Sequence, residues 1–192
     1  MAASSPKLDI VGLCGSLQAG SLNGMALRLA GECMPPGMVL EVVEWSLVPP
    51  FNADVLELGI PVPVQRIRDR IARADGVVIA TPEYNFSLPG MFKNLIDWVS
   101  RGVDQPLAHK PVAILSAATG PLGGARVQYD LRRVLLFVNA MVLVKPEVFI
   151  GNARSKFASD GQCIDEATRQ FVTGQMDSFG RWIAQARALQ QA

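Results

Sequence analysis

The chain has few of the residues from which metal sites and acid–base catalytic sites are built. Its 192 residues include one histidine, His109, and three cysteines that form no Cys-x-x-Cys pair. We therefore expect no metal site. His109 stands beside Lys110-Pro111 just ahead of an apolar run, which favours a residue at the solvent-exposed edge of a sheet. Three widely separated cysteines predict free thiols in a reducing cytosol, and so a cytoplasmic protein.

Blocks of like charge and long apolar runs are also missing. Eighteen basic and 17 acidic residues give a net charge of +1. Because proteins that bind nucleic acid or membrane surfaces carry basic patches, we expect neither partner. The longest apolar run, residues 134–144, contains Asn139 and is too short to cross a bilayer. The length suits one domain over residues 1–192, with residues 1–6 expected to be flexible.

Strand-like apolar runs alternate with amphipathic stretches, which is the pattern of βαβ units around a parallel sheet. The expected strands are 8–14, 39–44, 77–80, 111–117 and 141–144, and the apolar pattern leaves open an extension of the last to 150. Helices are expected over residues 23–32 and 64–74. A third helix begins at Pro89-Gly90, a fourth ends near Phe137, and the last follows Asp165, which is its expected N-cap. Five strands and five helices predict a doubly wound, five-stranded parallel sheet of order 2-1-3-4-5 in a three-layer α/β/α arrangement.

The loop after the first strand, called the first loop here, has the composition of a phosphate site. It reads GSLQAGSLN over residues 15–23 and leads into a helix N-terminus, where backbone amides and the helix dipole attract anions. Ser16, Ser21 and Asn23 add side-chain donors. The loop has no P-loop lysine and no GxGxxG, so a triphosphate or a dinucleotide bound in the Rossmann manner is disfavoured. A phosphate monoester remains, and the plain alternative is a Ser/Asn helix cap.

The loop after the third strand, the third loop, is the most informative part of the chain. Residues 76–80 read GVVIA, a strand buried on both faces, and the polar and aromatic sequence TPEYNFSLPG follows. Open α/β sheets bind their ligands at the carboxyl ends of such strands. Glu83, Tyr84, Asn85 and Ser87 together suit a flat heterocycle with polar edges. An ordinary connection from strand to helix is the alternative.

A loop of small residues, the fourth loop, ends the fourth strand and reads SAATGPLGG over residues 116–124. Small residues let a ligand approach the backbone, although a tight turn before a helix also explains Gly123-Gly124. In a sheet of order 2-1-3-4-5 the first, third and fourth loops border one crevice. A phosphate at the first loop and a ring between the other two is the layout expected for flavin mononucleotide, FMN.

These segments, in this order, resemble the NADPH-dependent FMN reductase family, which includes chromate, quinone and azo reductases. The matching pieces are GSLQAGSLN, PEYNFSLPGMFKNLIDWVSR and SAATGPLGGAR, and the resemblance extends over about residues 7–182. It implies a flavodoxin-like fold and bound FMN, with NADPH or NADH as co-substrate. The residues implied in cofactor binding are Ser16, Gln18, Ser21, Leu22, Asn23, Pro82, Glu83, Tyr84, Asn85, Phe86, Ser116, Ala117, Gly120 and Gly123.

The resemblance also implies that the cofactor, and no side chain, carries the chemistry. Turnover would be ping-pong, with hydride transfer from NADPH to FMN followed by reduction of a quinone, chromate, an azo compound or free flavin. Tyr84 and Asn85 would shape the face that receives the nicotinamide. Relatives are commonly dimers or tetramers, so we expect a homodimer or homotetramer, with polar contacts between subunits from Arg126, Tyr129 and Glu147.

Two other functions fit parts of the sequence. A flavodoxin-type electron carrier would bind FMN without its own nicotinamide chemistry, but such carriers tend to be strongly acidic and this chain is nearly neutral. A phosphate-binding hydrolase or mononucleotide sensor would use Ser16 as nucleophile or anchor, but no base or metal set accompanies it. We favour the NAD(P)H oxidoreductase and keep the electron carrier as the alternative.

One departure from the family pattern leads to a testable prediction. The family reads GSLR in the first loop, and Gln18 stands here in place of the arginine. A neutral amide attracts phosphate less than a guanidinium, because charge-assisted hydrogen bonds are about twice as strong. If the side chain faces the nicotinamide cofactor, kcat/KM should be nearly equal for NADPH and NADH. A preference for NADPH of about a thousandfold would contradict this.

Overall fold

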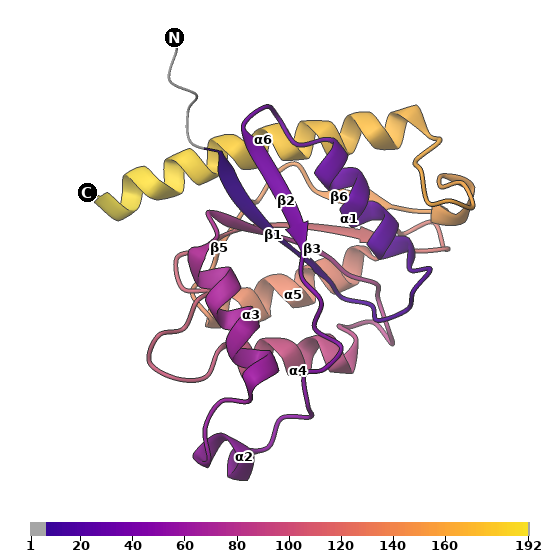
Figure 1. Ribbon diagram of the computed structural model, residues 1–192. Helices are drawn as coiled ribbons and strands as arrows, with labels where there is room; N and C mark the ends of the chain where they lie inside the picture. The colour runs from indigo at the N-terminus through magenta and orange to yellow at the C-terminus, as the bar shows by residue number, and fades with distance from the viewer. Residues whose placement is uncertain (1–6, 192) are drawn as a thin grey trace.

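The computed structural model describes residues 7–191 and has a sheet between two layers of helices (Figure 1). The strands are β1 (Leu8–Cys14), β2 (Met38–Val42), β3 (Gly76–Ala80), β4 (Pro111–Ala117), β5 (Met141–Val142) and β6 (Val148–Ile150). The helices are α1 (Leu22–Glu32), α2 (Ala53–Glu57), α3 (Val62–Arg73), α4 (Gly90–Val99), α5 (Ala125–Phe137), α6 (Glu166–Gln191) and the 3-10 turn η1 (Ala153–Ser155). Residues 1–6, predicted to be flexible, lie outside the described part of the chain.

The strand order is the predicted one, β2-β1-β3-β4-β5, and all the pairs are parallel. The fifth position differs from the prediction, because it is divided into β5 and β6, which both pair with β4. The short helix α2 has no counterpart among the predicted elements. The doubly wound, flavodoxin-like α/β/α architecture is therefore confirmed. That residues 1–192 form one domain stays a prediction.

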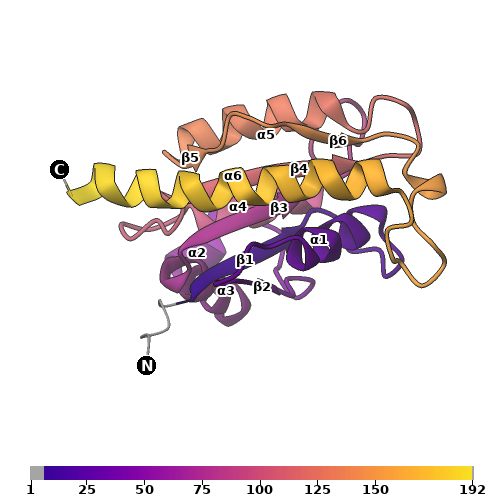
Figure 2. The same ribbon diagram turned by 90° about the horizontal axis from the view of Figure 1, so that it is seen from above.

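Alternating residues of the central strands divide the core into two halves. On β3, Val78 packs in the half that contains α1 and α6, whereas Val77 and Ile79 pack with α3, α4 and α5. Viewed from above, α6 lies along the sheet beside α1 (Figure 2). β3 and β4 are buried along their whole length, as expected for parallel strands covered on both faces. None of the helices within residues 7–191 is long and apolar enough to span a membrane.

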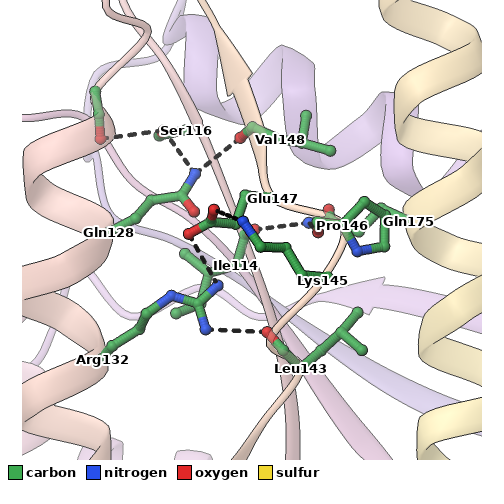
Figure 3. Close-up of polar contacts among 11 residues, drawn as sticks. Ile114, Ser116, Gln128, Arg132, Leu143, Lys145, Pro146, Glu147, Val148 and Gln175 are labelled. Carbon is green, nitrogen blue, oxygen red and sulfur yellow. Dashed lines mark hydrogen bonds and ion pairs between the residues drawn. The ribbon is translucent and has the colours of Figure 1, made fainter.

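Two buried amides and a partly buried guanidinium from α5 and α6 hold the linker between β5 and β6 and the first residue of β6 (Figure 3). The donors are the amides of Gln128 and Gln175 and the guanidinium of Arg132. They donate to the carbonyl oxygens of Val148, Pro146 and Leu143, at 2.8, 2.9 and 3.0 Å. A divided strand leaves carbonyls without ladder partners, and buried carbonyls need donors. These side chains therefore let the fifth strand position be interrupted inside the protein.

This arrangement predicts that Gln175→Leu destabilises the protein. Gln175 is 1% exposed, and its Nε2 also donates to the Ile114 carbonyl at 3.0 Å. Leucine removes both bonds and leaves buried carbonyls short of a donor, so the free energy of unfolding should fall by about 2 kcal/mol. Urea denaturation measures it. Gln170→Leu, on the exposed side of the same helix, is the control and should change stability by less than about 0.5 kcal/mol. Equal losses in the two variants would contradict the prediction.

Candidate functional site

The carboxyl ends of β1, β3 and β4 border a cavity of about 610 Å³, a volume typical of small-molecule sites. The first, third and fourth loops all contribute to its wall, as the strand order predicts. The residues singled out from the sequence that line this main cavity are Ser16, Gln18, Ser21, Leu22, Asn23, Pro82, Glu83, Tyr84 and Ala117. Those that lie outside its lining are Asn85, Phe86, Ser116, Gly120 and Gly123.

The first loop caps α1 and presents hydroxyl groups to the cavity. Ser21 Oγ accepts hydrogen bonds from the backbone N–H groups of Asn23 and Gly24, at 3.2 and 3.4 Å. Its own hydroxyl hydrogen remains able to donate. Ser16 Oγ accepts from the Gln18 N–H at 3.3 Å. The sequence left the helix cap and the phosphate site as alternative interpretations of this loop, and its geometry is compatible with both.

Asn23 joins the first turn of α1 to the end of β4. Its Nδ2 donates to the Ala117 carbonyl and its Oδ1 accepts from the Ala117 N–H, both at 2.9 Å. The side chain is buried, with the residue 2% exposed. A paired amide of this kind takes the place of a neighbouring strand at Ala117, the last residue of β4. The bonds that Asn23 makes hold the cavity wall, and direct contact with a phosphate stays a prediction.

The first and third loops touch because residue 15 is glycine. The Gly15 N–H donates to the Ala80 carbonyl at 2.7 Å. A Cβ at this position would lie 2.6 Å from the Cβ of Thr81, much closer than two carbon atoms can approach. Only glycine allows this distance between the two backbones. The Ser16 side of the cavity and the Pro82 side are therefore adjacent.

The third loop ends in a tight turn at Asn85-Phe86. Tyr84 and Ser87 exchange two backbone hydrogen bonds of 3.0 Å, and the two residues between them have φ of 50° and 68°. Two successive positive φ values are typical of a two-residue hairpin turn. Such a backbone is unfavourable for phenylalanine, and the Arg126 guanidinium, 3.9 Å from the Phe86 ring centre, stabilises it. Asn85 and Phe86 thus form the tip of the loop.

Glu83 connects the third loop to α5. Its Oε1 accepts from Arg126 Nε at 2.6 Å, and its Oε2 accepts from the Val127 N–H at 3.4 Å. A carboxylate in the first turn of a helix also interacts favourably with the helix dipole. The Glu83 side chain is 9% exposed, and its charge is balanced by Arg126. A contact of Arg126 with a second subunit stays a prediction.

The fourth loop uses two of its predicted site residues to form its own turn. Ser116 is fully buried, and its hydroxyl donates to the Gly123 carbonyl at 2.6 Å. Gly123 has φ of 60°, and a Cβ on it would lie 2.7 Å from the carbonyl carbon of Phe149. The tight-turn explanation accounts for both residues. Gly120 and Gly123 line a second cavity of about 300 Å³, which shares Glu83 with the main one.

The sequence did not single out the segment after β6, which also lines the main cavity. It contributes Arg154, Phe157, Ala158 and Ser159, and Gly20, Met25, Ala118 and Thr119 complete the wall. A signal was present, because the loop after the last strand of a parallel sheet ends at the same edge as the other ligand loops. Its polar composition alone, GNARSKFASDGQC, did not distinguish it from an ordinary connection.

The cavity is equipped to bind a molecule and offers little for nucleophilic chemistry. Burial raises the pKa of the Cys14 thiol, which keeps it protonated at neutral pH. Within residues 7–191, no three His, Cys, Asp or Glu side chains gather to hold a metal ion. His109 is exposed and precedes β4, at the opposite end of that strand from the cavity. The Glu83 carboxylate, the one acidic group in the described lining, is held by Arg126 and the Val127 N–H. The hydrolase alternative therefore gains no support.

Comparison with known proteins relates most of the chain to flavoenzymes. The family model described as NADPH-dependent FMN reductase matches residues 8–155. An NAD(P)H-dependent FMN reductase from Pseudomonas aeruginosa is 42% identical over 183 residues, 95% of this chain and 99% of the relative. A quinone reductase from Escherichia coli K12 is 45% identical over 186 residues, again 95% and 99%. The solved structure of the flavoenzyme NAD(P)H:(acceptor) oxidoreductase FerB from Paracoccus denitrificans superposes with a TM-score of 0.85 at 33% identity, covering 93% of this chain and 98% of that one.

The approach of the two loops leads to a prediction for Gly15→Ala. The new methyl group would overlap Thr81, so the loops must move apart and the free energy of unfolding should fall by about 3 kcal/mol. Gly20→Ala is the matched control in the same loop, because nothing lies within 4 Å of a Cβ there. It should change stability by less than about 0.5 kcal/mol in the same urea titration. If both variants are equally stable, the site does not depend on this contact.

Proposed function

The chain belongs to the NADPH-dependent FMN reductase family, and we propose that its cavity of about 610 Å³ holds FMN with the phosphate at the first loop. Members of this family are oxidoreductases, and this chain is an enzyme that uses FMN and NAD(P)H. One observation carries the placement of the flavin. The cavity joins a capped helix N-terminus to two loops at the carboxyl ends of β3 and β4, at the switch point of the sheet.

The residues around the cavity fit a phosphate at one end and a flat ring at the other. The backbone amides at the start of α1 and the hydroxyls of Ser16 and Ser21 would bind the phosphate. Pro82 and Tyr84 would lie against the ring, closed on the other side by residues 117–119. Because Arg126 balances the Glu83 carboxylate, no unpaired negative charge of that side chain opposes an anionic ligand.

Bound FMN would supply the redox chemistry, which is acceptance of a hydride from NAD(P)H and transfer of the electrons to an acceptor. The protein contributes position and an accessible face. Tyr84, which lines the cavity, is 52% exposed, so that we expect the cavity to be open to planar molecules on this side. We propose that NADPH or NADH and the acceptor use this face in turn, which is ping-pong turnover. The proposed acceptor is a quinone, as in the name of the Escherichia coli relative, with chromate, azo compounds and free flavin as further candidates.

Exposed apolar side chains on α5 bear on the oligomeric state, and the free cysteines bear on the cellular location. Leu136 and Phe137 on α5 are 77% and 84% exposed, an apolar surface of the kind that a second copy covers. This supports a homodimer or homotetramer. Cys14, Cys33 and Cys163 are free thiols, which supports a location in the cytoplasm, where thiols stay reduced.

The deciding experiment is an anaerobic titration of the FMN-reconstituted protein with NADPH, followed in the visible flavin band. We expect rapid bleaching, and parallel double-reciprocal plots when a quinone is then varied against NADPH. A bound flavin that stays oxidised would favour the electron carrier. Failure to bind FMN would contradict the assignment of the phosphate to the first loop.

A further inference from the structure

The main cavity obtains its positive charge from a distant part of the sequence. The first loop contains no lysine or arginine, and its Gln18 lines the cavity as a neutral side chain. The one basic residue in the described lining is Arg154, which belongs to η1 after β6. The one acidic residue there is Glu83, which pairs with Arg126.

The backbone that carries Arg154 is held firmly against the fourth loop. The Asn152 N–H donates to the Gly120 carbonyl at 3.0 Å, and the Ala153 N–H donates to the Ala118 carbonyl at 2.9 Å. Ala153 is fully buried on one side of Arg154, and Phe157, 6% exposed, packs into the core on the other. The segment is therefore fixed by the same loop that forms the cavity wall.

The Arg154 side chain is exposed, and its charge is available to a ligand. Across residues 7–191, the ion pairs of the protein do not include Arg154. A guanidinium stays charged at any physiological pH, and its planar set of donors matches the oxygens of a phosphate. Arg154 thus has the chemistry that the first loop lacks at Gln18, and both residues line the same cavity.

We propose that Arg154 binds a phosphate monoester in this cavity and replaces the cation that is missing at position 18. The inference rests on the proposed function. The phosphate monoester has two sources in that reaction, the 5′-phosphate of FMN and the 2′-phosphate of NADPH. Riboflavin and NADH lack these groups and are otherwise the same ligands, so they separate the two sources.

The test compares Arg154→Gln with Lys156→Gln, which removes the same charge two residues away and outside the cavity lining. Dissociation constants for FMN and riboflavin are measured from flavin fluorescence, and kcat/KM is measured for NADPH and NADH. If the phosphate is that of FMN, Arg154→Gln should weaken FMN binding about tenfold and leave riboflavin binding unchanged. If it is that of NADPH, the NADPH-to-NADH ratio should fall about tenfold instead. Lys156→Gln should change neither.

A rescue variant separates a lost charge from a damaged fold. Adding Gln18→Arg to Arg154→Gln should restore the lost phosphate preference, because residue 18 lines the same cavity. The inference is overturned if Arg154→Gln keeps both ratios at the wild-type values, or if Lys156→Gln lowers them equally. Wild-type protein that binds no FMN would instead refute the proposed function. If the wild-type protein prefers FMN to riboflavin and the Arg154→Gln variant keeps both wild-type ratios, the role of Arg154 is refuted and the proposed function is not.

Discussion

The close contact between Gly15 and Thr81 is the constraint on which the candidate site depends. β1 and β3 are neighbours in the sheet, and their register places Cys14 opposite Ala80. The chain leaves both strands at this point, so two ligand loops start side by side. A side chain at residue 15 would force them apart. The cavity therefore exists because the switch point of the sheet coincides with a residue that has no Cβ.

At the ends of the strands the regular backbone hydrogen bonding of the sheet stops, and hydrogen bonds from single side chains hold the loops in place. Asn23 pairs with Ala117 across the first and fourth loops. Glu83 accepts from the start of α5, and Ser116 closes the turn of the fourth loop. Each of these side chains has little exposed surface, and a buried polar group without a partner costs free energy. The loops are thus kept in place by bonds that are hard to exchange for water, which gives a preformed site.

The charged groups around the cavity come from different segments of its wall. The third loop carries the carboxylate, but Arg126 balances it. The first loop offers backbone amides and hydroxyls and has no basic side chain. A full positive charge comes from η1 through Arg154. The cation and the helix-start amides of this cavity thus come from different elements, which is possible because an ionic contact depends on distance and orientation in space and not on chain order.

Local patterns in the sequence determined the bounds of β1 and β4 and the use of Asp165 as the N-cap of α6, where it accepts from the Thr168 N–H at 3.0 Å. The alternation of strands and helices along the whole chain, read with the rules for doubly wound sheets, predicted the sheet order. Hydrophobic periodicity and cap chemistry act over a few residues, so they can be read along the chain. Only the tertiary structure showed which groups Asn23 and Ser116 bond, that the fifth strand is divided, and that Arg154 lines the cavity. Asn23 and Pro146, in the linker between β5 and β6, bond partners 29 or more residues away, and Arg154 lines the cavity together with loop residues that precede it by more than 30 positions, so only the folded chain brings these groups together. The Ser116 hydroxyl bonds the nearby Gly123 carbonyl, but the path of the backbone between them is not readable from its composition.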